Sequence, residues 1–199
     1  GGGRGQPGGM ATVAEAEPAG AGPRKFSFVY IPCDDGEAFQ EWQIAPREGH
    51  EVGCLVDCVK AHFHKKLPRM SEAQRAEQAR RLQASLPEGT SVSEQMLRLA
   101  TEIQMVDAIP LVPCKPETDW TGVNMYVDDQ GAFKELPQNR RAGDILGTCG
   151  VRERVVHGDA FLARLRDWEQ GDVFERLDFT LKELNSSADW VKVARRAHG

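Results

Sequence analysis

The alternation of apolar and other residues is clearest between residues 121 and 136, where it predicts a β-hairpin. Three apolar residues recur at the period of two that a strand shows when one of its faces is buried: Val123, Met125 and Val127. Residues 128–131 then have the residue types of a tight turn, and they end on a glycine. We therefore predict that the chain returns antiparallel over residues 132–136.

The rest of the second half predicts short elements of both kinds. Asn139 is a residue type that caps helix N-termini, so a short helix should begin there and end at Gly147 or Gly150. The other expected elements are a strand at 154–157, a helical turn or irregular crossing at 159–166, a short strand at 174–180, and a helix that Ser187 caps and that runs through Arg196.

The first half predicts three strands and three helices. The strands are expected at 26–31, 41–45 and 106–112, and the helices at 52–67, from Ser71 through Leu86, and from Ser91 onward. Ser71 and Ser91 each open a capping-box pattern, which predicts a solvated outer helix and then an inward-packing one. Pro110 cannot donate to a β-ladder, so the third strand should lie near a sheet edge.

Together these elements predict a single α/β (α+β) domain over residues 26–199, with a small, mainly antiparallel sheet and several flanking helices. Two halves, 26–112 and 121–194, should share the sheet. Residues 1–25 consist of Gly, Ala, Pro and Glu with almost no large apolar side chain, so we predict a disordered N-terminal tail.

Charge and cysteine content narrow the classes of function. The net charge is −5 with mixed signs, which argues against broad electrostatic binding to nucleic acid or to anionic membranes. The five cysteines are odd in number and scattered, which indicates a reducing intracellular compartment, most simply the cytoplasm, with an organelle left open. No run of about 18 apolar residues is present, so we expect no transmembrane segment.

One group of residues has the chemistry of a zinc site: Cys54, Cys58 and His62, with His64 beside them. On one helix, residues eight positions apart lie about 12 Å from each other, so one metal ion could take only a neighbouring pair. We therefore interpret these residues as flanking a core helix, predict no cofactor, and keep zinc as an alternative.

Other reactive side chains have simpler structural interpretations. Cys149 lies near the predicted end of a helix, where a thiol is not activated, and we interpret it as a small buried residue. Asp128 suits a turn. Asp159 and Asp178 are too far apart in the sequence to predict a shared site, so no catalytic residue is assigned.

Several residues that we expect at the surface are candidates for contacts with a partner. Arg140, Arg141 and Arg154 cluster in the sequence and could bind an acidic partner, although we favour the simpler interpretation that these side chains are solvated. Trp168 lies between Asp167 and Glu169, and tryptophans often anchor interfaces.

Part of the second half resembles known sequences over residues 119–194. The motifs are Tyr126-Val-Asp-Asp-x-Gly131, Leu136-Pro-x-Asn139-Arg-Arg-Ala142, Val156-x-Gly158-Asp-Ala-Phe161, Phe174-x-Arg-x-Asp178-Phe179 and Ser186-Ser-x-x-Trp190-Val191. The first three resemble a domain of unknown function in phage and bacterial mobile-element proteins. Residues 158–161 and the last two motifs are similar to uncharacterised algal and protist proteins, some of which also carry MYND-type zinc fingers. This resemblance implies a fold class and no activity, and the sequence has no Cys-x-x-Cys of the MYND kind.

No nucleophile, base and oxyanion-binding group form a coherent set in the sequence. We therefore predict a non-enzymatic binding or assembly module, a subunit of a larger complex with a protein partner. Two alternatives stay open. One is a small thiol-dependent or hydrolytic enzyme built on Cys58, His62 and carboxylates from the second half, and the other is a zinc-binding regulatory protein.

Overall fold

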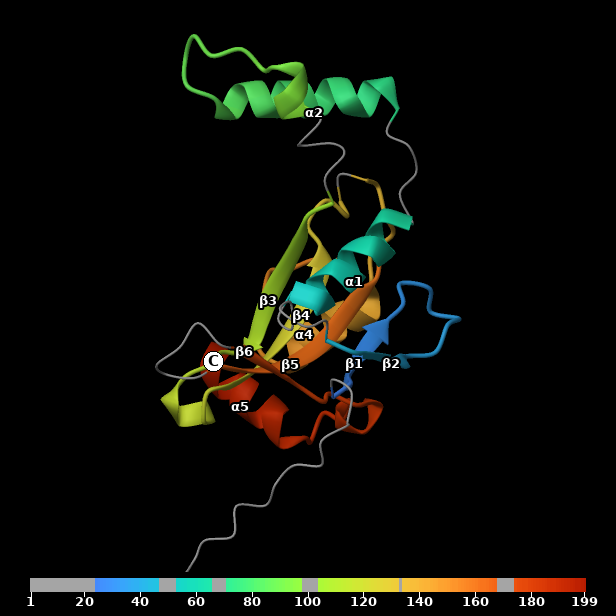
Figure 1. Ribbon diagram of the computed structural model, residues 1–199, viewed down its shortest axis with the longest axis vertical. Coiled ribbons are helices and arrows are strands. Elements are labelled where there is room, and N and C mark those ends of the chain that lie inside the picture. Colours follow the sequence, from blue (N-terminus) through green and yellow to red (C-terminus); the bar gives the residue numbers. More distant parts are fainter. Residues whose placement is uncertain (1–23, 47–52, 66–70, 98–103, 133, 168–173) are drawn as a thin grey trace, which may run out of the picture.

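The computed structural model describes residues 24–46, 53–65, 71–97, 104–132, 134–167 and 174–199. They form one six-stranded sheet, antiparallel throughout, with helices packed on it (Figure 1). The predicted fold class is confirmed. The predicted tail, residues 1–25, lies outside the described residues up to residue 23, and Arg24 Nη2 lies 3.4 Å from Asp178 Oδ2.

The sheet has the strand order β2-β1-β5-β4-β3, and β6 also pairs with β5. Its strands are β1 (Phe26–Ile31), β2 (Gln40–Ile44), β3 (Val106–Val112), β4 (Thr121–Asp128), β5 (Ala160–Asp167) and β6 (Phe174–Leu177). The helices are α1 (Gly53–Lys65), α2 (Glu72–Ser85), α4 (Arg140–Thr148) and α5 (Asp189–His198), with 3-10 turns at Pro116–Thr118 and Leu181–Glu183.

Strand β5 lies at the centre of the sheet. One edge pairs with β4, and the other pairs first with β1, at Phe161 opposite Tyr30, and then with β6, at Leu165 opposite Arg176. The prediction of a helical turn or irregular crossing at 159–166 is wrong. The run 160–163 is apolar at every position because both faces of this strand are buried, and such a run lacks the alternation that distinguishes a strand from a helix.

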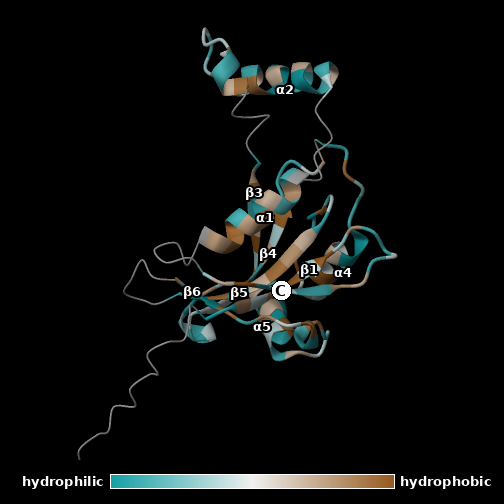
Figure 2. Cartoon of the chain, turned by 45° about the vertical axis from the view of Figure 1, so that its right-hand side comes forward, coloured by the Kyte–Doolittle hydropathy of each residue, from teal (hydrophilic) through white to brown (hydrophobic). Residues whose placement is uncertain are grey.

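Two hydrophobic cores lie on opposite faces of the sheet. On one face α1 packs on an aromatic core: Phe26, Phe28, Tyr30, Tyr126 and Phe161 from the strands, with Leu55, Val59 and Phe63 from the helix. On the other face α4 and α5 pack on an aliphatic core that includes Val29, Met125 and Leu162. Apolar residues accordingly concentrate on the strands and on the inner sides of these helices (Figure 2).

The predicted hairpin and the predicted strand at 154–157 are wrong. Strand β4 already has β3 and β5 on its two edges, so no edge is left for residues 132–136. Residues 132, 134 and 135 lie in turns instead, and Gly131 passes so close to His157 that a Cβ would lie 2.5 Å from its carbonyl oxygen. Of residues 154–157, only His157 makes a bridge, opposite Gln138.

The helix predictions hold better. Ser71 forms its capping box, α2 buries no residue, and Asn139 caps α4, which ends before Gly150 at a φ of +84°. In both views α2 lies apart from the sheet (Figures 1 and 2). Two predicted caps are wrong: residues 94–97 are helical, with Ser93 rather than Ser91 accepting from Met96 N, and α5 follows Ala188 rather than Ser187.

A buried polar cluster fixes the end of β4. Lys134 Nζ lies 2.6 Å from Asp128 Oδ2, and Gln104 Nε2 donates to Asp128 Oδ1 at 2.8 Å. Burial lowers the pKa of Lys134, and the hydrogen bond with Asp128 opposes that shift. The predicted turn chemistry of Asp128 is present too, since Gln130 N donates to Oδ1 at 2.9 Å.

In the described part of the chain, no helix is both long and apolar enough to cross a membrane. The five cysteines are free thiols.

Candidate functional site

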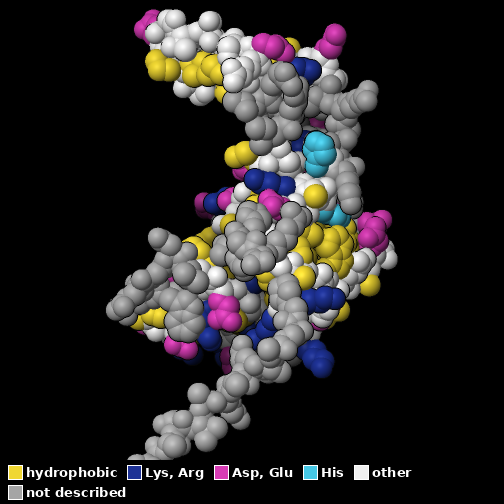
Figure 3. Space-filling model, viewed as in Figure 1, with side chains coloured by type: hydrophobic (Ala, Val, Ile, Leu, Met, Phe, Trp, Pro, Cys, Tyr) yellow, Lys and Arg dark blue, Asp and Glu magenta, His cyan; other side chains and the backbone are white. Residues whose placement is uncertain are grey.

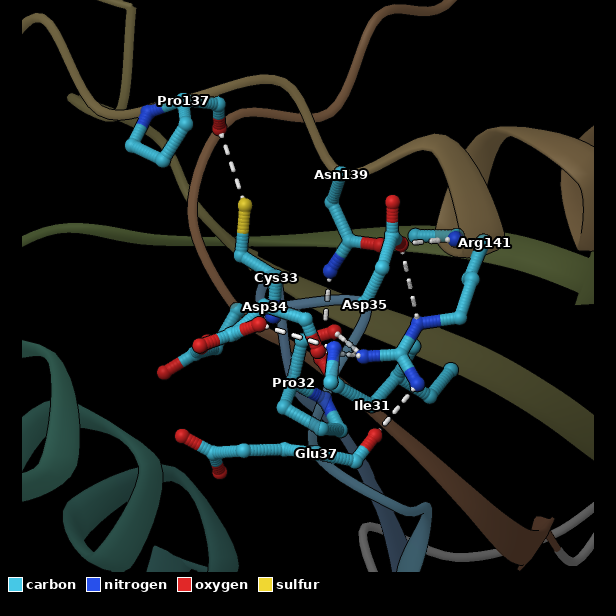
Figure 4. Close-up of polar contacts among 12 residues, drawn as sticks. Ile31, Pro32, Cys33, Asp34, Asp35, Glu37, Pro137, Asn139 and Arg141 are labelled. Carbon is cyan, nitrogen blue, oxygen red and sulfur yellow. Dashed lines mark hydrogen bonds and ion pairs between the residues drawn. The ribbon is translucent and has the colours of Figure 1, made fainter.

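The segment that joins β1 to β2, residues 32–39, lies against the start of α4 and the start of β5 (Figure 4). Polar side chains hold it there. On one side of this junction is a pocket between α4 and α5, and on the other is a histidine–aspartate pair under α1. The junction positions both.

Asn139 joins three elements through one buried side chain. Its Oδ1 accepts from Ala142 N at 2.9 Å and caps α4. Its Nδ2 donates to Ile31 O at the end of β1 at 3.1 Å, and to Gly158 O just before β5 at 3.0 Å. Both N–H donors and the oxygen of the amide are thereby used, so this amide fixes the start of α4 relative to the sheet.

Arg141 holds the segment 32–39 through the backbone carbonyl groups of that segment. Its guanidinium donates to three carbonyl oxygens, those of Pro32 at 2.5 Å, Glu37 at 2.6 Å and Asp34, and Nε lies 3.5 Å from Asp35 Oδ1 (Figure 4). A guanidinium has several donors in one plane, so it can bind several acceptors of a loop at once.

Arg141 also stacks on Phe39, with its Cζ 4.9 Å from the ring centroid. Such a contact is favourable because the face of an aromatic ring attracts a cation. The same ring lines a pocket between α4 and α5. Arg141 therefore positions one wall of that pocket.

The pocket has a volume of about 180 Å³ and an apolar interior with a polar margin. Ten residues line it: Phe39, Asp144, Ile145, Thr148, Cys149, Leu184, Asn185, Ser186, Trp190 and Val191. Trp190 is fixed by its Nε1, which donates to Glu183 O at 2.8 Å, and by an edge-to-face contact with Phe179. No motif in the sequence marks this site, because its lining comes from three separate segments.

Cys149 is fully buried where α4 ends beside the pocket. Burial raises the pKa of its thiol to about 11, against a weaker opposite effect of Arg195. The thiol is therefore protonated at neutral pH and is a poor nucleophile. This agrees with its interpretation as a small buried residue.

On the α1 face, His62 Nε2 lies 2.8 Å from Asp159 Oδ2. The other oxygen of Asp159 accepts from Cys33 N at 2.8 Å. Aromatic rings surround the imidazole, with centroids 5.1 to 6.0 Å away: Tyr30, Trp42, Phe63 and Phe161. The sequence could not identify Asp159 as the carboxylate that pairs with His62, because the two residues are 97 positions apart and only the sheet brings them into contact.

The zinc candidates lie at different depths along α1. Cys54 is buried in the aromatic core rather than at its flank, Cys58 is half-buried, and His62 contacts Asp159. Among the residues that the structure describes, no three His, Cys, Asp or Glu side chains are grouped so that they could hold a metal ion.

The remaining interaction candidates are Arg140, Arg154 and Trp168. Arg140 is exposed at the start of α4, and Arg154 Nη1 lies 3.3 Å from Asp107 Oδ2. Trp168 lies outside the described residues. The face seen in Figure 3 carries charged side chains of both signs, interspersed. A partner contact at Arg140, Arg154 or Trp168 stays a prediction.

The sequence matches no protein-family model and no curated protein. Among solved structures, the chain is similar to the small RNA methyltransferase HEN1, with a TM-score of 0.38 and 17% identity. The match covers 81% of this chain but 15% of that one. So low a TM-score supports no conclusion about function, and the resemblance of residues 119–194 to algal, protist and phage proteins stays a prediction.

Replacing Asn139 tests its role as the common anchor of β1, β5 and α4. We expect Asn139→Ala to lower the free energy of unfolding by about 2 to 4 kcal/mol, because it removes a helix cap and leaves buried carbonyl groups without donors. Asn139→Ser keeps a cap acceptor and should cost about 1 kcal/mol less. Urea unfolding measures both, and values within 0.5 kcal/mol of wild type for both variants would show that the anchor is dispensable.

Replacing Arg141 tests whether it orders the segment 32–39. In Arg141→Lys a single ammonium cannot reach the three carbonyl groups, so amides of this segment should exchange hydrogen about tenfold or more faster than in wild type. Hydrogen exchange read by mass spectrometry measures this. Arg140→Lys, at the exposed neighbouring position, is the control, and equal exchange in the two variants would contradict the assignment.

Proposed function

We propose that this protein is a non-enzymatic binding module that takes a side chain of a protein partner into the pocket between α4 and α5. The pocket carries this proposal. Aromatic and aliphatic side chains make up most of its lining, together with the polar side chains of Asp144, Thr148, Asn185 and Ser186. Interfaces commonly gain most of their affinity from one anchoring side chain that fills such a pocket.

The size of the pocket favours a side chain over a cofactor. Its volume of about 180 Å³ is below the range of about 300 to 1,000 Å³ that is typical of sites for drug-sized ligands. The chemistry of the lining supports binding rather than catalysis, since its cysteine is held as a thiol. Asp144 is the acidic side chain that lines the pocket.

Filling the pocket tests the proposal. Thr148→Trp places a large ring at its margin, so partner recovery in affinity capture from the native cells should fall by about 30-fold or more, since an anchoring residue contributes about 2 kcal/mol. Quantitative mass spectrometry of the captured proteins measures the loss.

Arg152→Trp is the matched control, because it adds the same side chain at an exposed position that does not line the pocket. It should retain the partner. A stoichiometric partner that stays bound to Thr148→Trp would show that binding occurs elsewhere.

A second candidate function is a small thiol-dependent hydrolase, and the contact between His62 and Asp159 favours it. Cys58 lies one helical turn before His62 on α1, and residues four apart are neighbours on a helix surface. In such a mechanism Cys58 gives its proton to the imidazole and attacks an acyl carbon, and Asp159 orients the ring. The leaving group then takes the proton, and water releases the acyl group.

Alkylation rates distinguish this candidate from a structural role. If His62 activates Cys58, iodoacetamide should modify it at pH 7 faster than Cys33 or Cys114, which have a similar half-buried setting, and His62→Gln should remove the difference. Peptide mapping of the native protein measures each rate. A Cys58 that reacts no faster than Cys33 would exclude this function.

A further inference from the structure

We infer that the side chain bound in the pocket between α4 and α5 is a lysine or an arginine of the partner protein. This inference rests on the proposed function and specifies the chemistry of the partner. It combines three observations: a largely apolar lining, a carboxylate on that lining, and an aromatic wall.

The interior suits the stem of a long side chain. Ile145, Leu184 and Val191 present aliphatic groups to the cavity, and Trp190 supplies an aromatic surface. Lysine and arginine bury their methylene stems on such surfaces while the charged end stays near water. A side chain that is apolar throughout would also fit these walls, so the charges at the margin decide between the two.

Asp144 is the charged residue that lines the pocket. It is exposed, and in the described part of the chain no lysine, arginine or histidine forms an ion pair with it. Arg140 precedes Asp144 by one helical turn on α4 and is exposed. Arg141 binds the segment 32–39, and Arg195 Nε donates to Thr148 O at 2.7 Å. A cation brought by a partner would therefore meet a carboxylate that the protein does not itself neutralise.

The aromatic wall adds to the preference for a cation. The guanidinium of Arg141 lies over one face of Phe39, 4.9 Å from the ring centroid, so Trp190 is the ring available to a second cation. Trp190, the ring type that binds cations best, also lines the cavity. A carboxylate together with aromatic rings is a combination that recognises ammonium and guanidinium groups.

Three pentapeptides that differ only at the central residue test the inference: lysine, norleucine or glutamate between capped alanines. Norleucine has the alkyl stem of lysine without its ammonium group. We expect the lysine peptide to bind about three- to fivefold more tightly than norleucine, as for a partly exposed ion pair, and the glutamate peptide to bind most weakly. Chemical shifts of the Ile145 and Val191 amides and of the Trp190 indole follow the titration of the full chain.

Asp144→Asn should remove the advantage of lysine over norleucine and leave norleucine binding unchanged. Asp129→Asn changes the net charge equally at an exposed turn and should keep the advantage.

Norleucine binding as tightly as lysine, or an advantage that survives Asp144→Asn, would overturn the inference while the pocket remains a binding site. No saturable shift with any peptide would overturn the proposed function itself. Butylammonium binding as tightly as the lysine peptide would identify a free amine, not a protein side chain, as the ligand.

Discussion

The burial of β5 on both faces is the constraint on which the other parts of this fold depend. Residues 160–163 are apolar at every position, so each face of the sheet needs a cover. Helix α1 packs on one face over an aromatic core. Two short helices, α4 and α5, cover the other, and the pocket lies where they adjoin each other and the residue before β2.

Backbone groups just beyond the end of a strand have no hydrogen-bond partner in the sheet and need one elsewhere. In this chain side chains are those partners. The carbonyls of residues 31 and 158 accept from Asn139, and the carbonyls of residues 32, 34 and 37 accept from Arg141. In a loop without regular structure, such contacts replace the ladder that strands provide. The segment 32–39 is consequently shaped by two residues more than 100 positions away.

Elements that local residue patterns specify were predicted correctly from the sequence. Predictions were wrong where the structure depends on tertiary contacts. Alternation identified β1 and β4, side-chain chemistry identified the caps at Ser71 and Asn139, and Pro110 correctly placed β3 at an edge. The hairpin after β4 failed because turn residues do not reveal whether an edge is free. The central strand failed because a run buried on both faces has no period.

The candidate sites were harder to predict than the fold. Arg141 and His62 were chosen for their chemistry, but their partners lie in distant segments. The carboxylate of Asp159 and the ring of Phe39 could not be assigned to them without the strand order. The lining of the pocket has ordinary core residue types, so only the geometry distinguishes Ile145 and Val191 as a surface for binding.

The two contacts of Phe39 have a thermodynamic consequence for the pocket. One ring is shared between a guanidinium that organises a loop and a cavity that is open to a ligand. A ring that the loop already holds in place loses less conformational entropy when a ligand binds. Order in the loop and affinity in the cavity are therefore linked. By reciprocity, an occupant of the cavity would slow the opening of the loop. Variation at residues 33–38 can therefore tune recognition without altering any atom of the binding surface.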